Sequence, residues 1–147
     1  MIAELLDISR IELDVDAGDW REAIRMAGRA LVQSGKIGEE YVEGTIRAVE
    51  ELGPYIVIMP GAAFAHSRPD ASVKEDCMQL IRLKTPVNFG SSRNDPVKLV
   101  IMFAAKDSNG HLEALQKLAE LMSEPSNVQL LMESDTIKEI QELLAEY

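Results

Sequence analysis

Apolar residues return at helical spacing in the first third of the chain. Between Asp19 and Gly35 they recur every three to four positions, which predicts a helix with one buried face. Asp19 and Glu22 suit its amino end, because carboxylates stabilise the positive end of a helix dipole. A second helix is predicted over Glu39–Leu52, and Gly53–Pro54 should end it.

The pattern then changes to short apolar runs typical of strands. Tyr55–Met59 is rich in β-branched residues and is bounded by prolines, which predicts a strand. Cys77–Leu83 predicts another, ending at Lys84–Pro86. Val97–Ala105 is the strongest strand, and its nearly continuous apolar character indicates burial on both faces of a sheet. The polar stretch Asn88–Pro96 between the last two predicts a loop.

Helical spacing returns after the last strand. One helix should begin at His111 and end near Met122, and a short one should cover Ser126–Met132. Thr136 and Glu139 form a capping pair for a third. The order of elements is helices, then strands, then helices. This order predicts an α/β fold, a three-layer α/β/α sandwich around a small mixed sheet.

Length and composition indicate a single domain over residues 1–147, with 46% hydrophobic and 27% charged residues. No segment approaches the roughly 20 apolar residues that a membrane span needs. Residues 1–7 lack the basic region of a signal peptide. The single cysteine, Cys77, excludes an internal disulfide bond. We therefore expect a cytoplasmic protein.

Charge and motifs exclude several function classes. The 25 acidic and 15 basic residues give a net charge of −10, which argues against a nucleic-acid partner and favours one with a basic face. The sequence has no glycine-rich phosphate loop, dinucleotide fingerprint or nucleophile elbow. A metal site built from both histidines with Asp107 or Cys77 lacks recognisable ligand spacing. We expect neither a cofactor nor a metal.

The candidate chemistry lies with the two histidines of the chain. His66 closes the flexible small-residue run Pro60–Ala65, on a loop after a predicted strand, where a neutral imidazole can act as a nucleophile. Arg68 could neutralise an anion bound there, because a guanidinium matches phosphate oxygens with paired donors. The alternative is that Arg68 pairs with Asp70 or Glu75 at the surface.

His111 falls in the first turn of a predicted helix. Unpaired backbone N–H groups and the helix dipole favour an anion at such a position, and the imidazole could donate a hydrogen bond to it. The simpler interpretation is that His111 faces water and that His66 is an ordinary surface residue.

Together these segments resemble the enzyme IIA components of the bacterial phosphoenolpyruvate-dependent sugar phosphotransferase system, in the mannitol/fructose class. The likeness covers nearly the full chain. Its most specific segments are Gly53–Tyr55, Pro60–His66, Asn94–Val97 and Ala104–Leu112. Within that class, Glu50–Gly61 and His66–Pro69 are most similar to the L-ascorbate-specific branch.

The resemblance implies a phosphoryl carrier with a sheet of about five strands. His66 matches the phosphorylated histidine of the family, and His111 matches its second active-site histidine. The family accepts phosphate from the phosphocarrier protein HPr and passes it to a cysteine of enzyme IIB, which serves the membrane permease IIC. A regulatory domain controlled by its phosphorylation state, and a binding module without covalent chemistry, stay open as alternatives.

The chain departs from the family pattern at two places. Ala65–Ser67 replaces the common Pro-His-Gly sequence, and Val49 stands where mannitol-type members carry an arginine. Arg68 is therefore our candidate for the group that stabilises the phosphate. A homodimer formed through exposed residues of the first helix is also open.

Overall fold

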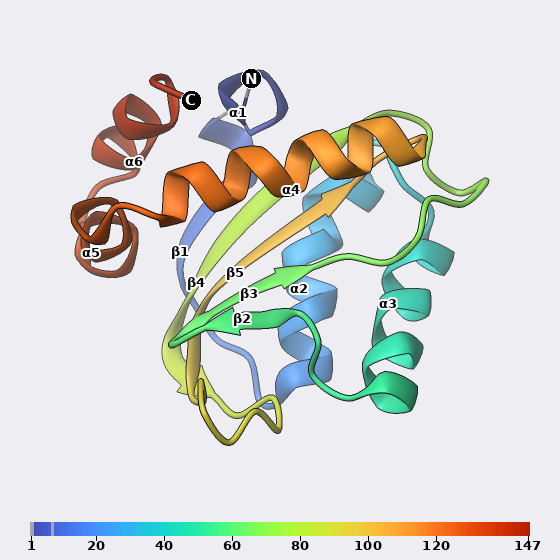
Figure 1. Ribbon diagram of the computed structural model, residues 1–147, viewed down its shortest axis with the longest axis horizontal. Coiled ribbons are helices and arrows are strands. Elements are labelled where there is room, and N and C mark those ends of the chain that lie inside the picture. Colours follow the sequence, from blue (N-terminus) through green and yellow to red (C-terminus); the bar gives the residue numbers. More distant parts are fainter. Residues whose placement is uncertain (1, 7) are drawn as a thin grey trace.

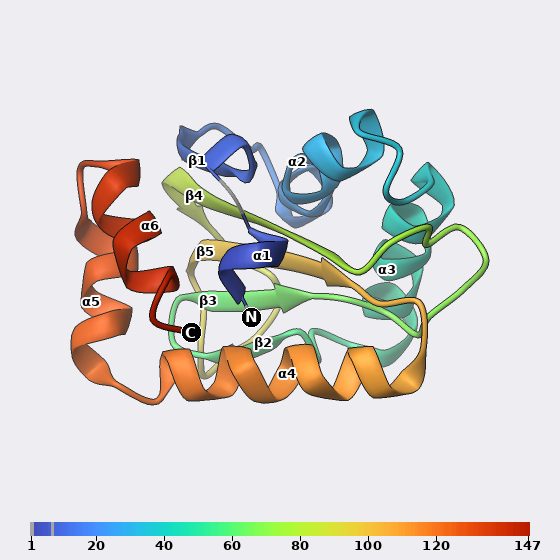
Figure 2. The same cartoon turned by 90° about the horizontal axis from the view of Figure 1, so that it is seen from above.

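A five-stranded mixed sheet, in the order β1-β4-β5-β3-β2, separates two layers of helices (Figures 1 and 2). The computed structural model describes residues 2–6 and 8–147. The strands are β1 Ile11–Val15, β2 Val57–Met59, β3 Ala62–Ala65, β4 Cys77–Val87 and β5 Val97–Ala104. The expected α/β sandwich with a small mixed sheet is confirmed. Within the described residues, no helix has the length and apolar character to cross a bilayer.

Each face of the sheet has its own helices and its own core. The helices α2 Trp20–Gln33 and α3 Glu39–Leu52 cover one face. The other face is covered by α1 Ile2–Leu5, α4 Ser108–Met122, α5 Pro125–Glu133 and α6 Ile137–Leu144, and the short 3-10 helix η1 Ile8–Arg10 leads into β1. The side chains of β4 and β5 contribute to both cores, as expected for central strands.

Local capping determines where several helices begin. The Asp19 carboxylate accepts the N–H of Glu22 at 2.9 Å, as the sequence predicts for α2. The Thr136 hydroxyl accepts the N–H of Glu139 at 3.4 Å at the start of α6. At the other end of α3, Gly53 adopts a positive φ of 85° and donates its N–H to Val49.

Three strand predictions need correction. The strand expected over Tyr55–Met59 is shortened to β2, and β4 continues through the expected stop at Lys84–Pro86 to Val87. Beyond Leu83 β4 no longer pairs with β1, and an unpaired strand edge tolerates proline because no partner needs its N–H. The β1 strand was not predicted, so a strand precedes α2 and the expected order of elements is wrong at its start.

The largest correction concerns the segment before His66. Pro60–Ala65 was expected to be a flexible loop, but Ala62–Ala65 forms the fully buried strand β3. This strand pairs in parallel with β5, from Ala62 opposite Leu99 to Ala65 opposite Met102. Alanine has little intrinsic strand propensity, so tertiary pairing overrides the local preference here. Because β3 and β5 are parallel, their carboxyl ends lie at the same edge of the sheet.

Candidate functional site

The two histidines meet at this carboxyl edge. His66 directly follows β3, and His111 lies in the first turn of α4, which the chain enters after β5. The centroids of the two imidazole rings are 5.3 Å apart. In Figure 1 this region is found where α4 begins, close to the end of β3 and to α3. The fold therefore brings together two side chains that the sequence analysis could only mark separately.

Three neighbours determine the orientation of the His66 ring. Its Nδ1 lies 2.6 Å from the carbonyl oxygen of Phe64. Since a carbonyl can only accept, Nδ1 carries the proton and Nε2 keeps its lone pair. The ring stacks on Phe103 with centroids 4.8 Å apart, and Tyr55 meets it edge-on at 5.4 Å while donating its hydroxyl to the His66 carbonyl. His66 is therefore held with Nε2 as its free nitrogen.

The environment of His66 also favours its neutral form. Burial lowers the pKa of the imidazole below its ordinary value of 6.5. The hydrogen bond to Phe64 raises this pKa in part, and the nearby His111 lowers it again. A neutral ring with a free Nε2 is the nucleophilic form of histidine near pH 7.

His111 contributes a buried ring nitrogen with no partner. Its ring lies 5.5 Å from that of Phe103, centroid to centroid. Its Nδ1 is inaccessible to solvent and makes no hydrogen bond with the described part of the chain. Leaving a buried polar atom unpaired costs about 1–3 kcal/mol, so such atoms are found where a ligand or a reaction supplies the partner.

Arg68 is exposed beside the two histidines. Its guanidinium forms no hydrogen bond or ion pair with residues 2–6 or 8–147. Asp70 instead accepts the N–H of Ser72 at 2.7 Å, and Glu75 pairs with Lys36. The surface pairs considered for Arg68 in the sequence analysis are thus not formed, and its cationic group is available to an anion.

The three predicted site residues, His66, Arg68 and His111, line one cavity of about 480 Å³. Tyr55 and Leu52 also line it. A second cavity shares Arg68, Pro69 and His111 with the first and is also lined by Lys106, Asp107 and Ser108. Two basic residues, Arg68 and Lys106, and two acidic residues, Asp70 and Asp107, thus line the cavities beside the histidines.

Sequence reasoning missed two contributors to this site. Tyr41 lies on the buried face of α3, and its hydroxyl lies 2.9 Å from the Phe103 carbonyl and accepts the Ser67 N–H at 3.1 Å. Burial raises the pKa of Tyr41, so the hydroxyl stays protonated and joins α3, β5 and the segment after His66. Lys106, which lines the second cavity, drew no attention because a lone lysine in a turn has no distinctive pattern.

Val49 contributes no charged group to the site. Its side chain is buried in the core between α3 and the sheet. The position that the resemblance assigns to an arginine therefore carries an apolar contact in this chain. Of the basic residues, Arg68 and Lys106 line the cavities that contain His111.

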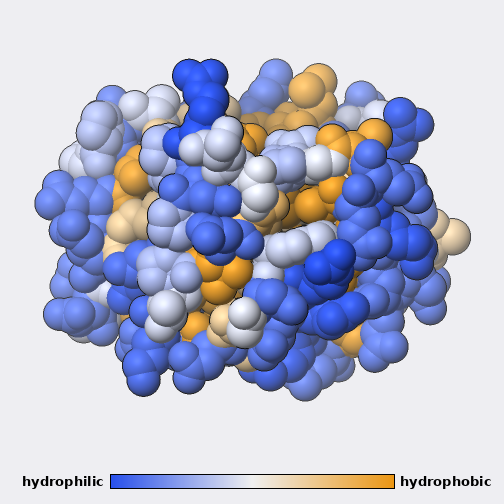
Figure 3. Space-filling view, turned by 90° about the horizontal axis from the view of Figure 1, so that it is seen from below, coloured by the Kyte–Doolittle hydropathy of each residue, from blue (hydrophilic) through white to orange (hydrophobic). Residues whose placement is uncertain are grey.

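Apolar side chains are exposed around the cavity. Leu52 is 74% exposed at the end of α3, and Leu112, which follows His111, is 56% exposed. Tyr55 is partly exposed, and Ile58 is exposed on β2. The side of the molecule where α3 ends and the β4–β5 loop lies is mostly hydrophilic, with apolar atoms in small separate patches (Figure 3). Leu52 and Tyr55 thus place apolar surface at the cavity that His66 and His111 line.

Comparisons with known proteins agree on one family. Residues 4–147 match the family described as "Phosphoenolpyruvate-dependent sugar phosphotransferase system, EIIA 2". The ascorbate-specific EIIA component of Escherichia coli K12 is 33% identical over 141 residues, covering 95% of this chain and 92% of the relative. The mannitol-specific cryptic enzyme IIA of Escherichia coli superimposes with a TM-score of 0.89 at 28% identity, with 100% of both chains covered. The mannitol enzyme IIA of Escherichia coli in complex with phosphorylated enzyme IIB superimposes with a TM-score of 0.84 at 28% identity, covering 97% of this chain and 100% of that one.

Proposed function

Because the chain belongs to the EIIA 2 family of the phosphoenolpyruvate-dependent sugar phosphotransferase system, a family of phosphotransferase components, we propose that it carries a phosphoryl group on Nε2 of His66. The donor is phosphorylated HPr and the acceptor is a cysteine of an enzyme IIB that serves a permease IIC. The observation that carries this proposal is the 2.6 Å contact of His66 Nδ1 with the Phe64 carbonyl, which leaves Nε2 free beside His111.

The transfer needs no covalent chemistry beyond one exchange of N–P bonds. The lone pair of His66 Nε2 attacks the phosphorus of the donor phosphohistidine, and the bond between that phosphorus and the donor nitrogen breaks. The electron pair of the broken bond returns to the donor imidazole. The phosphorylated His66 ring is then cationic with its proton on Nδ1, and the Phe64 carbonyl stabilises that proton. The same positive charge makes the phosphoryl group ready to leave for the next acceptor.

The oxygens of the moving phosphoryl group carry negative charge, which the site residues offset. His111 places its imidazole 5.3 Å from that of His66, centroid to centroid, and Arg68 supplies a guanidinium that pairs with no group of the described chain. Hydrogen bonds and charges placed where negative charge gathers stabilise the transition state most strongly in a site that excludes water. In this proposal Arg68 replaces the family arginine whose position Val49 occupies.

The exposed apolar rim is the proposed docking surface for both partners in turn. Leu52 and Tyr55 line the cavity that holds His66, and the exposed Leu112 follows His111 on α4. A related mannitol enzyme IIA forms a complex with its phosphorylated enzyme IIB, which supports enzyme IIB as a partner here. L-ascorbate is the proposed transported sugar, because the ascorbate-specific component is 33% identical over 95% of the chain. We place the carrier in the cytoplasm, where HPr would meet it.

Intact-mass analysis tests the carrier function. After incubation with phosphoenolpyruvate, enzyme I and HPr, the wild-type protein should gain one acid-labile phosphoryl group. His66→Ala should gain none. His111→Ala should still gain the phosphoryl group, because it keeps the acceptor nitrogen of His66, but more slowly than the wild type. Circular dichroism confirms that each variant is folded. Phosphorylation of folded His66→Ala would exclude His66 as the acceptor.

A second experiment tests the branch. The phosphorylated protein is mixed with an ascorbate-type enzyme IIB or a mannitol-type enzyme IIB, and loss of phosphate from His66 is followed by mass. Faster transfer to the ascorbate-type protein supports the proposed sugar. Equal or faster transfer to the mannitol-type protein contradicts the branch while leaving the carrier function intact.

A further inference from the structure

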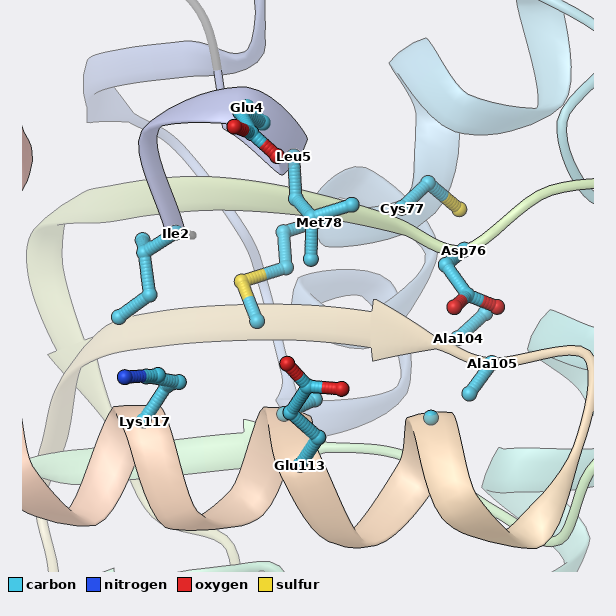
Figure 4. A pocket seen from close by; sticks show the side chains of 12 residues that line it. Ile2, Glu4, Leu5, Asp76, Cys77, Met78, Ala104, Ala105, Glu113 and Lys117 are labelled. Carbon is cyan, nitrogen blue, oxygen red and sulfur yellow. The ribbon is translucent and has the colours of Figure 1, made fainter. Parts of the chain in front are cut away.

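Asp76 holds the loop that leads into α4. It lies just before β4, and its Oδ1 accepts the backbone N–H of Lys106 at 2.7 Å. Figure 4 shows its carboxylate pointing toward the start of α4, at one end of a cavity of about 190 Å³ that is also lined by Met78, Glu113 and Lys117. A side chain distant in sequence thereby ties the β5–α4 loop to the body of the sheet.

The other oxygen of the same carboxylate lies against Gly110, the residue before His111. A Cβ atom added to Gly110 would lie 2.8 Å from Asp76 Oδ2 and 3.3 Å from Asp107 Oδ1. Asp107 accepts the Gly110 N–H at 2.7 Å as the cap of α4. Asp107 therefore caps the first turn of α4, Asp76 holds the loop before it, and Gly110 fits between the two carboxylates.

We propose that Asp76 is a positioning residue for His111, acting through its contacts with Lys106 and Gly110. The inference rests on the proposed function and extends it to a residue outside the cavity of the two histidines. Lys106 and Gly110 bracket the turn that begins α4, so a shift of either moves the His111 ring relative to His66. Phosphoryl transfer depends on such placement, since a displacement of about 1 Å can cost on the order of 100-fold in rate.

Four variants separate positioning from charge. Asp76→Ala removes both contacts, and Asp76→Asn keeps an oxygen that can accept from Lys106. Glu113→Gln is the matched control, because it removes one negative charge from the same cavity and its side chain makes no hydrogen bond within the described part of the chain. Gly110→Ala inserts the Cβ that pushes the Asp76 carboxylate away, while alanine suits a helix better than glycine.

The readouts are single-turnover phosphorylation by phosphorylated HPr over a range of donor concentrations, and the imidazole resonances of the two histidines. We expect Asp76→Ala and Gly110→Ala to lower the maximal rate at least tenfold, with little change in the donor concentration at half-maximal rate. Asp76→Asn should recover most of that rate, and Glu113→Gln should match the wild type. The His111 resonances should move in Asp76→Ala and return in Asp76→Asn.

Several outcomes overturn the inference. One is a folded Asp76→Ala with the wild-type rate; another is an equal loss in Asp76→Ala and Glu113→Gln, which would indicate a charge effect. A loss in Asp76→Asn as large as in Asp76→Ala also contradicts it. If Asp76→Ala does not fold, the test rests on Gly110→Ala. An unchanged maximal phosphorylation rate in that variant overturns the proposal. A wild-type protein that accepts no phosphate defeats the carrier function instead, and the His111 resonances then still test the positioning.

Discussion

Two sets of polar side chains on the same sheet differ in how their hydrogen bonds are satisfied: Gln79 and Arg82 on β4, and the histidines at the carboxyl ends of β3 and β5. On β4, the buried Gln79 amide accepts the N–H of Ala30 at 3.0 Å and donates to the Met26 carbonyl at 3.1 Å. These are the two groups that an α-helix ordinarily joins to each other, so the side chain connects β4 to α2. Arg82, also buried, donates to the carbonyls of Leu131 and Ser134 at the end of α5.

The cluster at the carboxyl ends of β3 and β5 is the opposite case. His66 has a free Nε2, His111 has a buried Nδ1 without a partner in the described chain, and Arg68 pairs with nothing there. Exposed leucines adjoin these groups. Gln79 and Arg82 find their hydrogen-bond partners within the protein and contribute to its stability. The histidine cluster keeps unpaired groups and is therefore suited to a transient ligand. Changes in the first should lower stability, and changes in the second should lower transfer.

The largest effect is expected from His111→Ala. Removing a group that stabilises the phosphoryl oxygens should slow phosphorylation of His66 by about 10²–10³-fold. The free energy of unfolding should stay near the wild-type value, because the lost nitrogen has no partner to leave unpaired. Rapid-quench mass analysis gives the rate, and urea denaturation gives the stability. A large loss of stability with an unchanged rate would mean that His111 stabilises the fold and takes no part in the transfer.

Arg82→Met should have the reverse effect. It leaves the carbonyls of Leu131 and Ser134 without their donor, which should lower the free energy of unfolding by about 2–4 kcal/mol. Urea denaturation measures this loss. Phosphorylation of His66 in the fraction that is folded should proceed at the wild-type rate. A stable variant would mean that these carbonyls find water or other donors.

Arg68→Gln should slow phosphorylation by about tenfold, since one exposed charge near the phosphoryl oxygens contributes on the order of 1 kcal/mol. Arg25→Gln is the matched control. Arg25 on α2 is also exposed, but it pairs with Glu43 on α3 at 2.9 Å, and neither residue lines the cavity of the histidines. Stopped-flow or quench kinetics at low ionic strength gives the clearest difference. Equal rates for the two variants would remove Arg68 from the mechanism.

The smallest effect is a shift in the pH profile. Burial lowers the pKa of His66 below 6.5, so its neutral form persists as the pH falls past that value. The maximal transfer rate should therefore fall as the pH drops and should reach half of its plateau only below pH 6.5. Because His111 also lowers this pKa, His111→Gln should move the midpoint upward, toward 6.5. A wild-type midpoint above 6.5 would contradict the lowered pKa of His66.

The sequence predicted the helices better than the strands. The caps at Asp19 and Thr136 and the stop at Gly53 act within a few residues, so their patterns are visible along the chain. By contrast, β1 is only five residues long and alternates apolar and polar positions too briefly to stand out. Likewise, β4 passes through Pro86 because its neighbour β1 has ended, a circumstance that local sequence does not record.

The histidines show the same division. His66 and His111 could be chosen from their flanking residues, and the resemblance paired them in function. Their separation of 5.3 Å, the free Nε2 and the unpaired Nδ1 could not be predicted, because each depends on how β3, β5 and α4 are arranged in space. Lys106 and Tyr41 could not be assigned to the site from the sequence, because their places in it also depend on this arrangement in space.

By itself the sequence determined the helical segments, the central strand, the acidic surface and the two imidazoles, since periodicity, caps and residue chemistry are local properties. Only the tertiary structure decided that Ala62–Ala65 forms a buried strand, that the strands β3 and β5 end at one edge, and that a carboxylate from before β4 reaches the loop that leads into α4. The physical reason is that strand pairing and hydrogen bonds between distant residues derive their free energy from neighbours that the linear pattern does not specify.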